Sequence, residues 1–476
     1  MENERKLLAT ACSQDQGVCH DTIRDRFSTL PDEIAHHILS MVDLRDLTRV
    51  GALSKGCYEF YLSTPSFCFD AHFGNMQRKS NKMNCFDQFL RRRGNNKIHH
   101  FGIDLSLPAS LSCKVFQVMT WIDNAARCSV EVLNLQLTMN SKGNMVGLPS
   151  SIFRCGSLRS LMVKMEEIFK VPSFPCPNNL QHLNLSYVRI DEGFSKWISS
   201  SCKCIKEIKL LMVSTDNLTI ENSSLESFTF VACSDLCCLN ISGEKLEIIH
   251  IKWKFFNPGS RSLHICAPNL KYLKWVGDLV SHPKLEKLLC LEKAEIFLEA
   301  KSICVCDFHN AFEFLCSICR AKALILSDKT IKALFREGSM AAPIFDTSYL
   351  RINIANLNNA LVPPMVSLMR GMSNLNTLDI KSDPSLFFLE PKACGFNGKY
   401  WKSQNLDFVN QLKEVTIELS NGNNAWQLAR FILEHAQNLK KMTIFYLPRK
   451  LHVIDKVSNS KKVSSATIDF HEKQWT

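Results

Sequence analysis

The chain has 476 residues, of which 46% are hydrophobic, and it carries a formal net charge of +11. This length exceeds that of one ordinary domain, so the sequence predicts several domains or a repeat architecture. No run approaches the ~20 consecutive apolar residues of a membrane span, and the first ten residues lack the apolar core of a signal peptide; we therefore expect a protein of the cytosol or nucleus with no membrane partner and with reduced cysteines.

The first segment, residues 1–26, has no apolar periodicity and is typical of a mobile tail. Cys12, Cys19 and His20 are its only candidate metal ligands. Three donors on a mobile segment make a poor metal site, so an unstructured extension is the better interpretation.

Residues 27–70 predict three short helices. Ser28 or Thr29 is suited to cap the first helix and Pro31 to occupy its first position. Apolar residues recur at helical spacing and exceed what ~40 residues can bury among themselves, so the module is expected to need a partner. The predicted contact residues are Leu30, Pro31, Ile34, Ile38, Leu39, Leu44, Leu47, Val50 and Leu53.

This segment resembles the F-box. Its ordered phrases LPDEI, HIL, LSK and STPS are most similar to plant F-box proteins that carry leucine-rich repeats and a C-terminal FBD domain. Those relatives usually place Arg-Trp where this chain has Gly56 and Cys57, and a second Trp where it has Tyr61. If the missing indole costs contact area, Cys57→Trp should strengthen binding to the adaptor that the resemblance implies.

Residues 84–93 predict one further helix, which Gly94 ends. Arg91, Arg92 and Arg93 lie in its last turn, where positive charge complements the helix dipole. We interpret them as a solvated cluster rather than a nucleic-acid contact. Residues 98–107, a helix around Trp121 and a strand before residue 138 resemble the connecting segments of the same plant family.

From residue 130 onward the phrase L-x-x-L-x-L recurs every ~20 to 37 residues, the period of leucine-rich repeats. Each L-x-L predicts a short strand whose apolar residues point into a solenoid and whose intervening residue points to the concave face of a parallel sheet. The expected strand pairs are Leu161/Val163, Leu183/Leu185, Ile208/Leu210, Phe228/Phe230, Ile249/Ile251, Leu273/Trp275, Ile296/Leu298, Leu324/Leu326, Leu350/Ile352, Leu378/Ile380, Val415/Ile417 and Met442/Ile444.

Several residues that flank these strand apolars are basic. Strand stacking would align them in a column of positive charge that could hold an acidic or phosphorylated target segment. The alternative is that an exposed sheet simply tolerates lysines. The predicted target-binding residues are Lys164, Lys209, His250, Lys252, Lys274 and Arg351.

The cysteines admit two interpretations. Cys155 and Cys202 occupy the small apolar slot before a repeat leucine. The pair Cys304 and Cys306, together with Cys316, Cys319 and the nearby His309, has a spacing that could hold zinc, but core packing on a strand and a helix accounts for it better. We therefore predict no metal and no cofactor.

Residues 401–476 resemble the FBD region, with the order strand, loop, helix, strand and a closing strand at SSATIDF. A solenoid needs a terminal unit over its last apolar layer, so capping is the preferred role. The expected domains are a tail at 1–26, the F-box at 27–70, a linker and N-terminal cap at 71–129, repeats at 130–400 and the C-terminal cap at 401–476. The predicted fold class is α/β: a small all-α F-box followed by an irregular repeat solenoid.

The sequence contains no Gly-rich phosphate loop, no G-x-S-x-G and no H-E-x-x-H, so nothing indicates an enzyme. The resemblance implies a substrate-recognition subunit of a Skp-cullin-F-box ubiquitin ligase, with a Skp-family adaptor, a cullin and an unknown target protein as partners. The alternatives are a non-ligase repeat scaffold with a degenerate F-box and, less favoured, a nucleic-acid-binding solenoid.

Overall fold

The structure is a computed structural model of the chain. It describes residues 26–71, 76–107, 114–139, 147–173, 178–233, 236–255, 257, 259–286, 288–299, 307–335, 343–355, 357–382, 396–419, 424–446, 455, 457–460 and 462–473. The N-terminal tail, and with it Cys12, Cys19 and His20, lies outside these residues.

Three short helices form the N-terminal module: α2 (Asp32–Leu39), α3 (Leu44–Gly51) and α4 (Lys55–Ser63). Pro31 precedes α2 at the N-cap position, one residue earlier in the helix frame than predicted. The other two helices begin at side-chain caps, since Asp43 accepts from the Asp46 amide and Ser54 accepts from the Cys57 amide. The predicted three-helix arrangement is confirmed.

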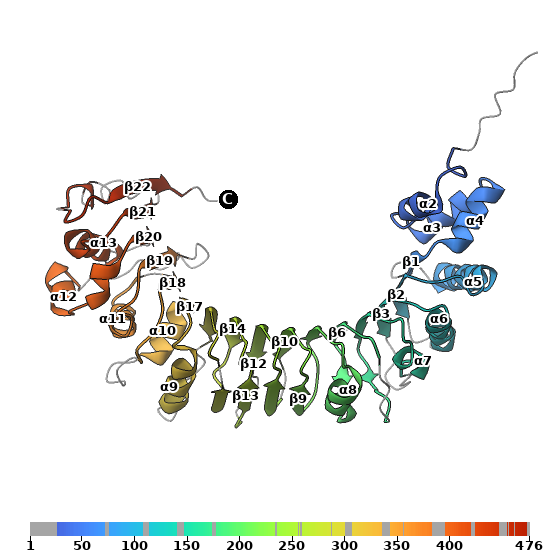
Figure 1. Cartoon of the computed structure of the whole chain (residues 1–476), viewed down its shortest axis with the longest axis horizontal. Coiled ribbons are helices and arrows are strands. Elements are labelled where there is room, and N and C mark those ends of the chain that lie inside the picture. The colour runs from blue at the N-terminus through green and yellow to red at the C-terminus, as the bar shows by residue number, and fades with distance from the viewer. Residues whose placement is uncertain are drawn as a thin grey trace, which may run out of the picture.

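A long parallel sheet follows the module. Figure 1 shows that it lines the inner side of an open arc, with helices on the outer side. Because each strand pairs with the equivalent strand of the next repeat, the apolar face of every repeat is covered by its neighbours. In the described residues the sheet has sixteen strands: β1 (Ser66–Ala71), β2 (His100–Leu107), β3 (Val132–Met139), β4 (Ser160–Met165), β6 (His182–Ser186), β8 (Glu207–Leu211), β10 (Ser227–Cys233), β12 (Ile248–Lys254), β14 (Tyr272–Gly277), β16 (Lys293–Leu298), β17 (Ala323–Ser327), β18 (Tyr349–Ile354), β19 (Thr377–Ser382), β20 (Glu414–Glu418), β21 (Lys441–Tyr446) and β22 (Thr467–Glu472).

The strand register confirms the repeat prediction. Leu183 pairs with Ile208 and Leu185 with Leu210, and all four side chains are buried. The predicted apolar pairs fall on the same two buried rows, with one exception. In β16 the register places Ala294 and Ile296 on these rows, so the predicted pair Ile296/Leu298 is wrong by two residues and Leu298 lies beyond the second row.

The outer side of the arc changes along the chain. In the middle it is a second parallel sheet, formed by β9 (Asn217–Glu221), β11 (Cys238–Ser242), β13 (Ser262–Cys266) and β15 (His282–Glu286). Helix α8 packs against edge strand β9 and α9 against edge strand β15, so both edges are covered. The shorter repeats thus return as strands and the longer ones as helices.

Helices cover the outer side elsewhere. They are α5 (Met76–Arg93), α6 (Val115–Arg127), α7 (Ser150–Phe153), α8 (Gly193–Ser201), α9 (Asp307–Ile318), α10 (Asp328–Leu334), α11 (Val362–Arg370), α12 (Gly398–Ser403), the 3-10 helix η3 (Asp407–Gln411) and α13 (Asn424–His435). A two-stranded sheet of β5 (Ile168–Phe169) and β7 (Arg189–Ile190) joins two of the repeats. Helix α5 begins eight residues before the predicted start, and Gly94, with φ +63°, follows its end as expected.

The two ends of the sheet are closed differently. At the N-terminal end β1 already belongs to the sheet, and α3 packs against it, so the helical module covers this edge. At the C-terminal end the FBD-like region adds β20, α13, β21 and β22 in the predicted order. This region continues the sheet, and its last strand leaves Ile468 and Phe470 half-buried.

Candidate functional site

Exposed apolar side chains are concentrated in the N-terminal module. Among the described residues, six of the fourteen exposed large hydrophobic side chains lie between residues 34 and 58. Ile34 and Ile38, one turn apart on α2, are 49% and 40% exposed. Met41 is 70% exposed and Leu53, between α3 and α4, is 75% exposed. Such a density of exposed apolar surface marks an interaction site.

The nine residues predicted to contact a partner divide by burial into exposed, half-buried and buried groups. The exposed residues are Pro31, Ile34, Ile38 and Leu53, the half-buried ones are Leu30, Leu44 and Val50, and the buried ones are Leu39 and Leu47. The expectation that Leu39 and Leu47 offer contact surface is wrong, because both are 1% exposed and hold the three helices together. Sequence reasoning missed Met41, which is exposed just before the Asp43 cap.

Small residues close the junction between α4 and the segment before α2. Cys57 is 2% exposed, and its Sγ lies 3.6 Å from Oγ of Ser28, which is 3.0 Å from Oγ of Ser54. A Cβ added at Gly56 would lie 2.5 Å from the same Ser28 oxygen. An indole at position 57 would have to displace these neighbours, so we expect overpacking there rather than a gain in adaptor binding.

Arg93 joins the helical module to the sheet. Its guanidinium donates to the carbonyls of Thr64 (2.6 Å) and Leu62 (3.2 Å) at the end of α4, and to those of Lys97 (2.7 Å) and Asn96 (3.1 Å) in the loop before β2. The side chain is 2% exposed, so its interpretation as part of a solvated cluster is wrong. Burial lowers the pKa of Arg93 to about 10, which leaves it charged at neutral pH.

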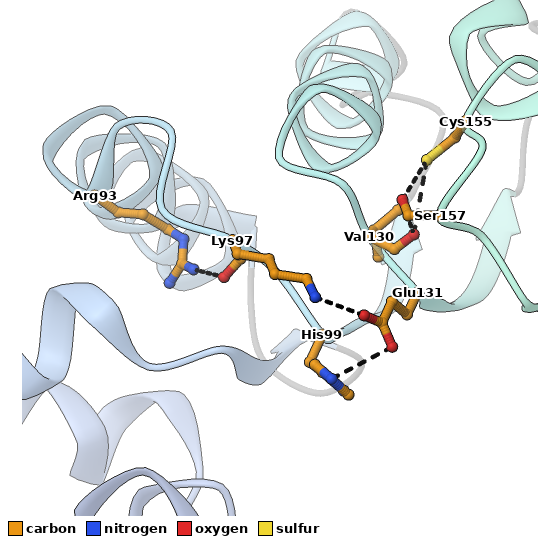
Figure 2. A network of polar contacts seen from close by, with 7 residues as sticks. All are labelled: Arg93, Lys97, His99, Val130, Glu131, Cys155 and Ser157. Atoms are coloured by element: carbon orange, nitrogen blue, oxygen red, sulfur yellow. Dashed lines mark hydrogen bonds and ion pairs between the residues drawn. The ribbon is translucent and has the colours of Figure 1, made fainter. Parts of the chain in front are cut away.

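The network extends from this loop to the next repeat. Figure 2 shows Lys97 and His99 pointing to the carboxylate of Glu131, at 2.7 Å and 3.3 Å. The hydrogen bond from Lys97 lowers the pKa of Glu131. Farther along, Ser157 donates to the Val130 carbonyl at 2.9 Å, so polar contacts link the loops that precede successive strands.

Apolar and backbone contacts reinforce the same junction. The ring of Tyr61 on α4 lies 4.8 Å from that of Phe89 on α5. The amides of His99 and His100 donate to the carbonyl of Pro65, at 2.7 Å and 3.2 Å. Backbone, aromatic and guanidinium contacts therefore hold the module on the sheet in one orientation.

On the concave face, carboxylates accompany three of the six basic residues predicted to bind the target. Lys209 pairs with Glu207 at 2.8 Å, Lys274 with Glu295 at 3.2 Å, and Arg351 Nε lies 2.8 Å from Asp379. Glu295 also accepts from Lys293 at 2.7 Å. The expected column of positive charge is therefore interrupted, because acidic residues of the same strand or of the neighbouring strand lie beside these cations.

The remaining predicted residues occupy two settings. His250 is half-buried, and its burial, together with the charge of nearby Lys274, lowers its pKa. Lys164 and Lys252 are exposed, and among the described residues neither has a carboxylate within ion-pair distance. These two lysines keep a charge that is free to meet an external anion.

The cysteine slots are occupied as predicted, since Cys155 and Cys202 are buried. Burial raises the pKa of Cys202 to about 12, as suits an uncharged core thiol. Cys316 lies on α9 and Cys319 directly follows its end, whereas Cys304 and Cys306 fall outside the described residues. Within the part of the chain that the structure describes, no group of three or more potential ligands is arranged to hold a metal ion.

None of the described helices combines the length and the apolarity that crossing a membrane requires.

Comparison with known proteins gives similarity along nearly the whole chain. A family profile described as "FBD-associated F-box protein At5g56370, LRR repeats" matches residues 118–288. The F-box/FBD/LRR-repeat protein At4g03220 of Arabidopsis thaliana is 24% identical over 462 residues, covering 88% of this chain and 89% of the relative. The FBD-associated F-box protein At5g22730 of the same plant is 23% identical over 453 residues, 90% of each chain.

A third relative, the F-box/LRR-repeat protein At4g14103 of Arabidopsis thaliana, is 24% identical over 376 residues, covering 75% of this chain and 91% of its own length. These similarities agree with the architecture of a three-helix module followed by a parallel repeat sheet. The chain is therefore similar, over most of its length, to plant FBD-associated F-box and leucine-rich-repeat proteins.

Proposed function

We propose that this chain is the substrate-recognition subunit of a Skp-cullin-F-box ubiquitin ligase. The helical module binds a Skp-family adaptor, and the concave sheet binds a target protein. The observation that carries the proposal is the exposed apolar surface around Ile34, Ile38, Met41 and Leu53, in a module whose own core is already filled by Leu39 and Leu47. The cytosol and nucleus suit such a subunit, since both maintain reduced thiols.

The mechanism is proximity rather than bond chemistry by this chain. A bound target presents its lysines to a ubiquitin-charged conjugating enzyme held by the same assembly, and the effective concentration replaces a bimolecular encounter. A rigid junction raises this concentration for lysines within reach, because slack in a linker spreads the target over a larger volume. The Arg93 contacts supply that rigidity.

The test is co-purification with a Skp-type adaptor and a cullin. Ile34→Asp combined with Ile38→Asp places two charges on a surface that binding would desolvate, so we expect adaptor binding to be lost while the fold is kept. Leu289→Asp is the matched control, because Leu289 is also exposed (62%) but lies before β16. Retained adaptor binding by the double variant would contradict the proposal.

The alternative is a repeat scaffold that has lost adaptor binding, and the small residues Gly56 and Cys57 are the feature that favours it. For such a scaffold, co-purification with the parental chain would yield a target protein but no adaptor and no cullin. Nucleic-acid binding is disfavoured, since Glu207, Glu295 and Asp379 neutralise cations on the concave face. Binding of an oligonucleotide that weakens steeply with salt concentration would support nucleic-acid binding instead.

A further inference from the structure

One row of the concave face differs from the rest in composition. Strand pairing aligns seven residues, one from each successive strand between β4 and β16, and we name them the apolar row. The residue that precedes each of them in its strand is buried in the core, so these side chains point to the concave side. The apolar row consists of Lys164, Ser186, Leu211, Val231, Lys252, Val276 and Phe297.

The charges of this row lack the compensation seen elsewhere on the sheet. The cations two residues earlier in the strands, such as Lys209 and Lys274, are paired with carboxylates. Lys164 and Lys252 have no such partner among the described residues, and both are exposed. Leu211 and Val231 lie between them, half-buried. The row therefore presents apolar surface flanked by two available positive charges.

Two bulky residues extend this surface in an unfavourable backbone conformation. Tyr187 and Met212 follow β6 and β8 with φ of 60° and 55°, and they are 50% and 39% exposed. Side chains with a Cβ rarely adopt this region, and glycine or asparagine fills it at lower cost. The turns bring Val188 and Val213 into the core. This requires a positive φ at the preceding residue but does not require a large side chain there. Costly exposed side chains of this kind point to a function.

These residues form one continuous surface. Tyr187 and Met212 follow the paired residues Ser186 and Leu211, so they lie side by side on neighbouring strands. The Tyr187 amide donates to the Leu211 carbonyl at 2.9 Å, which holds the two turns together. The Lys164 ammonium lies 5.8 Å from the centre of the Tyr187 ring. An aromatic, a thioether, two aliphatic side chains and a cation are thus contiguous.

We propose that the apolar row, with Tyr187 and Met212, binds an extended acidic and apolar segment of the target protein. Two carboxylates of the segment pair with Lys164 and Lys252, and apolar side chains between them pack on Leu211 and Val231. The lysines are four strands apart, about 19 Å at the spacing of a sheet, which an extended peptide spans in about six residues. This inference rests on the proposed function of target recognition.

The experiment selects peptides from a displayed library of random 12-residue sequences on the purified full-length chain. We expect enrichment of peptides with two acidic residues about six positions apart and aliphatic or aromatic residues between them. The affinity of an enriched peptide is then measured by fluorescence polarisation. Lys164→Glu with Lys252→Glu should weaken it at least tenfold, because each carboxylate then meets a like charge.

Two variants make the test specific. Lys196→Glu with Lys245→Glu changes the net charge equally at exposed positions outside the apolar row and should leave the affinity within twofold. Tyr187→Asn with Met212→Asn should weaken binding at least tenfold while leaving the unfolding midpoint equal or higher, since asparagine is better suited to this backbone. A merely structural role for the two residues would lower the midpoint instead.

Selection of no acidic and apolar peptides would overturn the proposal. Equal affinity of the parental chain and the Lys164→Glu, Lys252→Glu variant would do the same. Adaptor co-purification is a separate readout, because Lys164 and Lys252 lie on the sheet and not on the helical module. A failed peptide selection with retained adaptor binding therefore rejects this surface and leaves the ligase proposal standing.

Discussion

Arg93 should control how firmly the helical module is held on the repeat sheet. We consider its replacement by methionine, which keeps much of the apolar stem and removes the guanidinium. The Leu62 carbonyl still accepts a hydrogen bond from the side-chain Nδ2 of Asn96 at 3.1 Å. The carbonyls of Thr64, Asn96 and Lys97 lose the hydrogen bond that Arg93 donates. Only the Thr64 bond is fully buried, since Asn96 and Lys97 are exposed residues. One unpaired buried acceptor costs about 1–3 kcal/mol and each partly buried hydrogen bond contributes about 0.5–1.5 kcal/mol, so we expect a loss of about 2–5 kcal/mol in the local stability of the junction.

Arg93→Lys is the graded variant. A lysine keeps the charge, but its donors radiate from one nitrogen and cannot reproduce the planar fork that reaches two chain segments. Contact of the guanidinium with the Phe67 ring, 4.9 Å from its centre, is also lost. An intermediate loss of about 1–3 kcal/mol is therefore expected. Arg91→Met is the matched control, because Arg91 is exposed and forms only a surface pair with Asp87, so its effect should stay below about 0.5 kcal/mol.

Hydrogen exchange measured by mass spectrometry is the assay. Peptides that cover α4, β1 and the amides of His99 and His100 should exchange faster in Arg93→Met, since these amides bond to Pro65 across the junction. Peptides from β10 to β14 should be unchanged, because repeats contact only their neighbours. If Arg93→Met and Arg91→Met give the same exchange at the junction, the reasoning from buried hydrogen bonds is refuted.

Three further predictions concern packing and pH. Cys57→Trp should lower the thermal midpoint and not raise adaptor affinity, since overpacking a closed site costs about 1–3 kcal/mol; a tighter complex would show that the site opens. In the solenoid, Leu183→Ala should cost about 2–5 kcal/mol in urea unfolding and Asn184→Ala less than about 0.5 kcal/mol, because only the first side chain is in the core; equal effects would invalidate the assigned faces. Although burial opposes ionisation of Glu295, hydrogen bonds from two lysines and a tyrosine lower its pKa below the usual 4.5. The ionised Glu295 then contributes stability above pH 4.5, and this contribution is lost as the pH falls through the lower pKa of the folded state. Glu295→Gln should therefore weaken the pH dependence of the urea midpoint between pH 6 and 3; an unchanged pH dependence would show that other carboxylates dominate.

The sequence alone determined which residues form the repeat core. Each L-x-L is a local pattern of period two, so Leu183 and Leu185 point one way and Asn184 the other in any strand that they form. The caps Asp43 and Ser54, and Gly94 after α5, are equally local, since a helix end is decided within about four residues. The predicted solenoid and helical module needed no knowledge of distant contacts.

The tertiary structure decided everything that depends on residues far apart in the chain. Helical periodicity predicts that Ile38, Leu39 and Leu47 lie on apolar helix faces. Only the packing of the three helices buries Leu39 and Leu47 and leaves Ile38 exposed. Likewise, only the fold carries Arg93 back to the end of α4, some thirty residues earlier in the chain. Charge shows the same limit, because Lys274 pairs with Glu295 in the next repeat, while Lys252 has no carboxylate partner among the residues that the structure describes. The physical reason is that an ion pair or a buried face is a property of two chain segments, and their register is set when the repeats stack.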